Sequence, residues 1–213
     1  MSERESKSED GGEIGGDGEG EGVTGDGEGV TGDGEGVTGD GEGAIGGGGD
    51  LPDRVRRAFA DHGSFEPVDE GVWVAETTPF DAEVRAEPAA DGRIHFVVTV
   101  RVPTLSATAA DEVADVVEEG WIETFELRVV DVGGVTRGDH EFDPTVAVAA
   151  DEITVDFELT EINERRGVDD AGALINFVEG TYVQGVIPGY EYTEPLDGLL
   201  SAARQQGNSG GGF

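Results

Sequence analysis

The most regular pattern in the chain is a strict alternation of apolar and polar residues. Residues 93–102 direct one set of side chains to an apolar face, namely Ile94, Phe96, Val98, Val100 and Val102. Residues 80–87 alternate in the same way, and residues 72–77 form a shorter strand candidate. A period of two with one apolar face is typical of a sheet covered on one side, which is antiparallel. The pair Asp91-Gly92 predicts the hairpin turn between the second and third strands.

A second hairpin is predicted in "PTVAVAADEITVDFELTEI", residues 144–162. Its second strand alternates as clearly as residues 93–102. The side chains expected to face the core are Ile153, Val155, Phe157 and Leu159. The polar positions between them are expected on the open face of the sheet.

Helical spacing defines the remaining segments. The first helix begins in "DLPDRVRRAFADHGSF", with Asp50 as the expected N-cap and Gly63 as its end. The second is expected to open at Thr108, where Asp111 would complete a capping box, and to run to about Val130. Its predicted buried positions are Val113, Val116, Val117, Trp121 and Phe125.

A third helix is predicted over residues 170–186 with Asp169 as its cap, and a short fourth over 195–205. The order is therefore helix, three strands, helix, two strands and helix, followed by the short C-terminal helix. This order predicts an α+β fold with an antiparallel sheet of about five strands and helices on one face. Residues 51–205 have the length of one domain.

Residues 1–50 are expected to be a disordered tail, and residues 206–213 a second one. "GVTGDGE" occurs three times, at 22–28, 29–35 and 36–42. Glycine loses much backbone freedom on ordering, and scattered Val and Ile cannot compensate for that loss. The alternative is a calcium-binding repeat, but the glycine-rich calcium roll has a nine-residue period that seven does not match.

Charge changes the picture of possible partners. The chain carries 48 acidic and 13 basic residues, a net charge of −35, and Lys7 is its single lysine. Such a surface repels nucleic acids and anionic membranes. The absence of cysteine excludes disulfides, and no apolar run is long enough to span a bilayer. No signal peptide is recognisable, so a cytoplasmic location is expected.

The third helix lacks the charged side that contact with water would require. One arc carries Leu174, Val178 and Tyr182, while the opposite side carries Gly180 and Val183 with Gln184 close by. Glycine costs about 1 kcal/mol in a helix interior, which close approach of another backbone would explain. Three neighbours remain open: the helix at 195–205, the same helix of a second subunit, or a ligand.

Pro188-Gly189 ends this helix, and Tyr190 and Tyr192 follow it in "GYEYTEP". Tyrosine is amphipathic and common at protein interfaces, so these two side chains are interface candidates. The alternative is a loop that packs over the core and leaves the hydroxyl groups in water.

Candidate chemistry is sparse. In "GDHEFDP", residues 138–144, Asp139, His140 and Asp143 could hold a hard cation, although a solvated acidic loop explains the same residues. No nucleophile and base can be paired, and no cofactor is expected. Arg165-Arg166 could grip an anionic ligand or partner, or pair with Glu164, Asp169 or Asp170.

The element order over residues 51–186 resembles the type III secretion chaperone-like fold, which is shared with bacterial sensory-regulator-like proteins. That resemblance implies a curved antiparallel sheet and subunits that often pair. The phrases "LPDRVRRAF", "TTPFDA", "VTVRVPTL" and "VEGTYVQGVIPGYEY" resemble an uncharacterised haloarchaeal family over about residues 51–205. The acidic composition is similar to that of proteins from salt-accumulating archaea. That family implies no catalytic residue.

These observations predict a non-enzymatic interaction module, chaperone-like or regulatory, with a protein partner or a second copy of the chain. The alternative is a small-molecule-binding protein or enzyme with a pocket between the sheet and the C-terminal helix. Arg166, Tyr182, Gln184 and Tyr190 would line that pocket.

Overall fold

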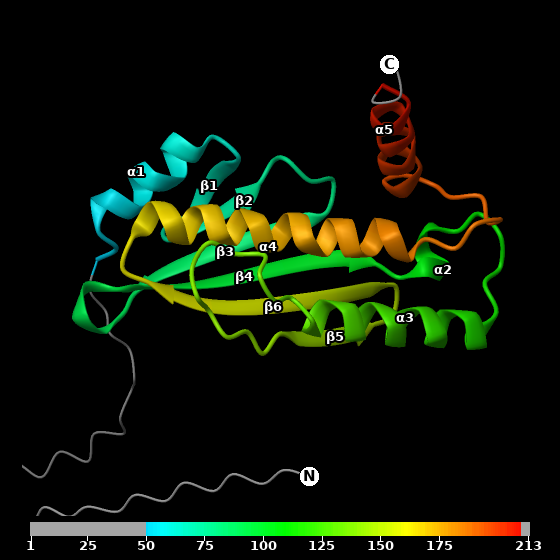
Figure 1. The fold of residues 1–213 in the computed structure, drawn as a ribbon, viewed down its shortest axis with the longest axis horizontal. Coiled ribbons are helices and arrows are strands. Elements are labelled where there is room, and N and C mark those ends of the chain that lie inside the picture. The colour runs from blue at the N-terminus through cyan, green and yellow to red at the C-terminus, as the bar shows by residue number, and fades with distance from the viewer. Residues whose placement is uncertain (1–49, 210–213) are drawn as a thin grey trace, which may run out of the picture. The chain divides into compact units, whose positions relative to one another are not determined.

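Six antiparallel strands form one sheet in the order β1-β2-β3-β4-β6-β5 (Figure 1). Their bounds are β1 Phe65–Asp69, β2 Val72–Ala75, β3 Asp81–Pro88, β4 Ile94–Pro103, β5 Thr145–Ala149 and β6 Glu152–Glu161. The predicted α+β class and antiparallel sheet are confirmed, with one strand more than expected. The additional strand, β1, buries only its first residue, Phe65, so no alternation marks it in the sequence.

The structure is a computed structural model, and it describes residues 50–209. The predicted N-terminal tail and its "GVTGDGE" repeats lie outside the described residues, except for Asp50. Residues 210–213 of the predicted C-terminal tail also lie outside them. Residues 206–209, which we assigned to that tail, form the end of the last helix.

The helices are α1 Asp53–His62, α2 Leu105–Thr108, α3 Asp115–Val130, α4 Glu164–Gly185 and α5 Leu196–Ser209, with a 3-10 turn η1 at Ala90–Gly92. Three expected helix starts are wrong. Pro52, not Asp50, occupies the cap position of α1. Thr108 closes the short helix α2, so α3 starts only at Asp115. Asn163 caps α4 by accepting from the backbone N–H of Arg166, which places Asp169 inside the helix.

The alternation predicted for the two central strands is confirmed. β4 and β6 pair along their whole length, from Ile94 opposite Glu161 to Pro103 opposite Glu152. All inward apolar side chains of both strands are buried, and the outward side chains of β4 are only half-buried. The apolar face of the sheet therefore forms the floor of the core.

Helix α4 lies across the buried face of the sheet, with α1 and α3 packed along its sides (Figure 1). Phe59 of α1 stacks on Trp73 of β2, with ring centroids 3.9 Å apart. On the other side, the indole N–H of Trp121 in α3 donates to the carbonyl oxygen of Gly185 at 2.9 Å. The first contact fixes α1 against the sheet, and the second fixes α3 against the end of α4.

Two glycines of α4 have opposite surroundings and predict opposite effects. A Cβ at Gly167 would overlap the ring of Phe96, because the helix lies directly on β4 there. A Cβ at Gly180 would approach only the flexible side chain of Gln184, at 3.9 Å. We expect Gly167→Ala to lower the free energy of unfolding by about 1–3 kcal/mol through overpacking.

In the matched variant, Gly180→Ala, the free energy of unfolding should rise by up to about 1 kcal/mol, because alanine is the better helix former. Chemical denaturation of both variants in the same saline buffer measures the two changes. A loss of stability in Gly180→Ala would show that another backbone covers Gly180 in solution.

Candidate functional site

One end of β6 has no strand partner on its outer side within the described chain. β5 pairs only with Glu152–Asp156, so Phe157–Glu161 pairs only with β4. The loop between α3 and β5 runs beside this free edge. Phe142 anchors the loop, because its ring meets that of Phe157 edge to face with centroids 6.1 Å apart.

The same loop is fastened to α4 by Asp170. The carboxylate accepts hydrogen bonds from the backbone N–H of Arg137 at 2.7 Å and of Gly138 at 3.0 Å. Its side chain is only 1% exposed. A buried carboxylate of this kind requires such donors, because an unpaired buried charge is very costly. Asp170 therefore determines where residues 137–140 lie.

Glu161 is a second buried carboxylate, at the last inward position of β6. Arg166 donates to its two oxygens from Nε at 2.6 Å and from a terminal nitrogen at 2.7 Å. The backbone N–H groups of Ile162 and Asn163 donate to Oε1 as well. The hydrogen bonds from Arg166 are the main reason that the pKa of Glu161 falls to about 2, although burial opposes them.

His140 completes the group. Its Nε2 lies 3.3 Å from Asp170 Oδ2 and 3.9 Å from Glu161 Oε2. This nitrogen is buried and makes no hydrogen bond within residues 50–209. The three ligand-type atoms lie within 4.8 Å of one another, and in the described part of the chain they are the only such group with metal-ligand spacing. We call His140, Glu161 and Asp170 the polar cluster.

A hollow of about 840 Å³ opens beside the polar cluster, with His140 and Glu161 in its wall. Its other walls come from the free edge of β6, the start of β4 and the 137–141 loop. His95 lies on the open face of the sheet, within 3.4 Å of Thr160 Oγ1 and 3.8 Å of Glu158. The hollow is polar and connects the polar cluster with solvent.

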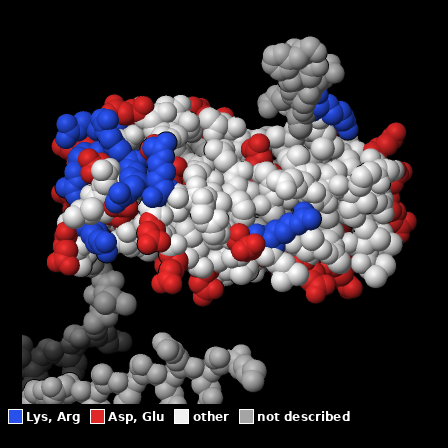
Figure 2. All heavy atoms as spheres, viewed as in Figure 1, with Lys and Arg blue, Asp and Glu red and all other residues white. Residues whose placement is uncertain are grey.

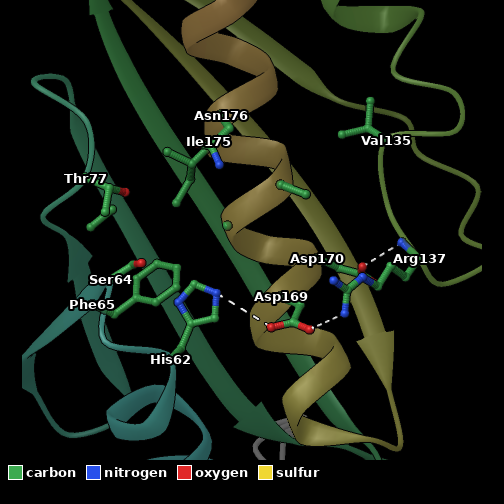
Figure 3. Close-up of a pocket in the computed structure, with 13 residues that line it drawn as sticks. His62, Ser64, Phe65, Thr77, Val135, Arg137, Asp169, Asp170, Ile175 and Asn176 are labelled. Atoms are coloured by element: carbon green, nitrogen blue, oxygen red, sulfur yellow. Dashed lines mark hydrogen bonds and ion pairs between the residues drawn. The ribbon is translucent and has the colours of Figure 1, made fainter.

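A smaller hollow, of about 230 Å³, lies between α4, the end of α1 and the start of β1 (Figure 3). Asp169 lies at the edge of this hollow, and its carboxylate is 2.8 Å from Arg137 and 3.6 Å from His62. Ser64, Thr77 and Asn176 line the other side. Asp169 thus links α4 to His62 of α1 and to Arg137 of the 137–141 loop. We therefore assign the residues around this hollow a structural role, which is to hold that loop.

The expected pairing of the arginine doublet is wrong. Arg165 pairs with Asp61 of α1 at 2.7 Å, and Arg166 pairs with Glu161, instead of with neighbours on their own helix. Of the metal candidates Asp139, His140 and Asp143, only His140 belongs to the polar cluster. Asp139 and Asp143 are exposed.

The prediction that no side of α4 is in contact with solvent is wrong. Asn176 and Gln184 are exposed, while Gly180 and Val183 are half-buried. Tyr182 is fully buried on the inner side, where burial raises the pKa of its hydroxyl to about 12 and Thr108 is its hydrogen-bond partner. α4 therefore has one buried face and one partly covered face.

Part of that cover comes from the C-terminal segment. A groove of about 340 Å³ lies between the end of α4, the loop that carries Tyr190 and Tyr192, and α5. Val183, Tyr190 and Tyr192 line it. Tyr192 donates from its hydroxyl to the carbonyl oxygen of Ile187 at 2.7 Å. Arg166 lines the hollow at the other end of α4, so the four residues expected to share one pocket are not brought together.

Charged side chains are unevenly distributed on the helix-bearing side of the domain. Arginines gather at the end where α1 lies, and carboxylates follow the margins (Figure 2). Most of the area over α4 is uncharged in the same view. No helix in the described range has the length and apolar composition that a membrane crossing requires.

The outer side of α3 carries three exposed apolar side chains. Val116 is 74% exposed, Leu127 68% and Val130 58%. With Gly120 and Glu123 they form one row, because the spacings of four and three residues keep successive members on one side of a helix. We call these five residues the α3 row. The prediction that Val116 faces the core is wrong, since the inward positions of α3 are Trp121, Phe125 and Val129.

Two residues of the polar cluster were missed, although the sequence contains a signal for one of them. Phe157, Leu159 and Glu161 are alternate residues of β6, and alternate residues of a strand face the same side. The alternation therefore directs the carboxylate of Glu161 into the core. Asp170 lies one turn before Leu174 on the buried side of α4. It was hidden because we expected the helix to start at this residue.

The model of the family of unknown function DUF5813 matches residues 60–202. The chain belongs to this family. The matched range includes the polar cluster and the α3 row. No curated protein and no solved structure matches the chain. A haloarchaeal origin and the chaperone-like fold therefore stay predictions.

The arginine doublet offers a matched test of the buried carboxylate. Glu161 has a pKa lowered from 4.5 to about 2, so its ion pair stabilises the fold fully above pH 4.5 and progressively less as the pH falls toward 2. We expect Arg166→Gln to lower the melting temperature at pH 7, and this loss to shrink between pH 4.5 and 2. The melting temperature is followed by circular dichroism with a chelator present.

Arg165→Gln is the control, because Arg165 and Asp61 are both largely exposed and such pairs contribute little. It should leave the melting temperature almost unchanged at both pH values. Equal losses in the two variants would contradict the assignment of Arg166 as the partner of a buried charge.

Proposed function

We propose that this member of the family is a non-enzymatic interaction module that pairs with a second copy of itself through the α3 row. The observation that supports the proposal is the exposure of Val116, Leu127 and Val130 on one side of one helix. Scattered exposed apolar residues are normal, whereas exposed apolar side chains aligned on one side of a helix favour a contact surface. The acidic composition and the single lysine support a saline cytoplasm as its setting.

The α3 row is complementary to itself when two copies run antiparallel about a twofold axis. Val116 of one helix then lies opposite Val130 of the other, and Gly120 lies opposite Leu127. A large side chain thus meets a residue without one, as ridges meet grooves in packed helices. A Cβ at Gly120 would have no neighbour within 4 Å among the described residues, so they leave the space over it open. A twofold contact requires self-complementarity of this kind.

Glu123 lies in the middle of the α3 row and would face its own copy across the axis. Two carboxylates at short distance repel each other, and salt weakens that repulsion because the Debye length falls to about 3 Å at 1 M. The pairing should therefore strengthen with salt. This dependence suits a protein whose net charge is −35.

A ligand-binding role is the second candidate. The observation that favours it is the polar hollow beside β6, where the buried Nε2 of His140 makes no hydrogen bond. A chaperone-like or regulatory role with another protein as partner would use the same α3 row.

Sedimentation equilibrium in molar KCl tests the pairing. At tens of micromolar we expect the full chain to sediment as a dimer, and Leu127→Glu to weaken the dimer at least about tenfold, because the contact would bury two additional charges, one from each subunit. Glu123→Gln should strengthen the dimer at low salt. The exposed Val68 of β1 provides the control, since Val68→Glu should leave the dimer intact.

Gly120→Ala separates pairing from folding. It should raise the melting temperature of the monomer slightly, because alanine favours helices, and weaken the dimer because the added methyl group would meet Leu127 of the second copy. A wild-type chain that remains monomeric in molar KCl would overturn the proposal.

A further inference from the structure

We propose that His140, Glu161 and Asp170 bind one divalent first-row transition cation, of which Zn²⁺ and Mn²⁺ are the best matches. The remaining coordination positions would face the hollow beside β6. This site is independent of the α3 row, which lies on another helix.

The distances within the polar cluster suit a shared ion. Ligand atoms about 2.1 Å from a metal, at tetrahedral or octahedral angles, lie about 3.0–3.4 Å from one another. His140 Nε2 and Asp170 Oδ2 are 3.3 Å apart, which falls in that range. Glu161 Oε2 is 3.9 Å from the same nitrogen, so a shift of about half an ångström at the end of its side chain would bring these two atoms into range, and all three ligand atoms lie within 4.8 Å of one another.

Both carboxylates are held by other groups and retain a free lone pair. In the described part of the chain, Glu161 Oε2 accepts only from Arg166 Nε, and Asp170 Oδ2 accepts only from the N–H of Gly138. A carboxylate oxygen can accept two such bonds. The hydrogen bonds from Arg166 and from the N–H of Gly138 therefore orient the two carboxylates and leave one lone pair on each ligand oxygen for a metal. Hydrogen-bond partners play the same role around known metal ligands.

His140 supplies the second, independent observation. Its side chain is 12% exposed, and Nε2 itself is buried without a hydrogen-bond partner among the residues that the structure describes. A buried polar nitrogen normally has a partner, so this atom needs an explanation. A proton on Nε2 would give an N–H···O contact of 3.3 Å to Asp170, which is long for a charged donor and acceptor.

The loop leaves room beside that nitrogen only because residue 138 has no side chain. A Cβ at Gly138 would overlap Nε2 of His140 and lie 2.9 Å from Asp170 Oδ2. Gly138 has no left-handed backbone angle that would otherwise favour glycine. The absence of a side chain at residue 138 therefore keeps the space beside His140 Nε2 and Asp170 Oδ2 open.

Charge also favours a cation. With a neutral imidazole, the polar cluster and Arg166 carry a net charge of −1, because one guanidinium faces two carboxylates. One nitrogen and two oxygen ligands suit Zn²⁺ and Mn²⁺, whereas Mg²⁺ and Ca²⁺ prefer oxygen alone. Three protein ligands with open positions are the arrangement in which a metal can also bind water or a small molecule.

Isothermal titration of the full chain with Zn²⁺ and separately with Mn²⁺, in molar KCl at pH 7, tests the site. The salt suppresses loose binding to the acidic surface. We expect one ion per chain, and a loss of affinity of at least about a hundredfold in His140→Ala, because a direct ligand is lost. His95→Ala is the matched control, since His95 lines the same hollow outside the polar cluster, and it should bind as the wild type does.

Nuclear magnetic resonance of the histidine rings gives a readout that does not depend on folding of a variant. The chain has three histidines, so their ring nitrogens can be resolved. Zn²⁺ should shift the Nε2 resonance of His140 and leave those of His62 and His95 in place. Gly138→Ala retains all three ligands, and it should still weaken binding because its methyl group would occupy the space beside Nε2.

Three results would each overturn the proposal. They are the absence of one-to-one binding in the wild-type chain, equal losses in His140→Ala and His95→Ala, and a His140 ring whose resonances do not respond to either metal. Binding of Mg²⁺ or Ca²⁺ as tight as that of Zn²⁺ would contradict the assigned ion class. None of these results bears on dimer formation through the α3 row.

Discussion

The burial of Glu161 is the constraint on which the end of the domain with the polar cluster depends. β6 alternates without a break, so its last inward position delivers a carboxylate under α4. A charge at that depth requires a cation and several donors, and the start of α4 supplies them through Arg166 and the turn at Ile162 and Asn163. These bonds fix the start of α4 against the end of β6.

Asp170 extends the same arrangement by about one turn of α4 beyond Arg166. Its carboxylate can be buried only because a loop presents two consecutive backbone N–H groups, and that loop follows α3 in the chain. β5 stops at the level of Asp156, which leaves the edge of β6 open for the loop. His140 reaches the two carboxylates because strand pairing and loop anchoring bring distant segments together.

The local patterns in the sequence predicted the sheet well and the helix boundaries poorly. Period-two alternation is a property of each strand alone, so β3, β4 and β6 could be located within a residue or two. Capping is ambiguous in an acidic chain, because Asp and Thr stand before every helix and most of them are surface residues. Thr108 and Asp169 were chosen on that signal, and the resulting shifts misplaced Val116 and concealed Asp170. The pairing of Arg166 with Glu161 crosses from helix to strand, and helical spacing alone cannot show it.

An exposed apolar row on a highly acidic domain is best understood through the solvent. At low salt, repulsion between carboxylates would keep two copies apart, and Glu123 in the centre of the row adds to that repulsion. In concentrated salt the repulsion is screened within a few ångströms, whereas burial of valine and leucine remains favourable. In the proposed pairing, ionic strength therefore sets the balance at the α3 row between repulsion and burial. The contact should strengthen in the saline setting that the composition indicates.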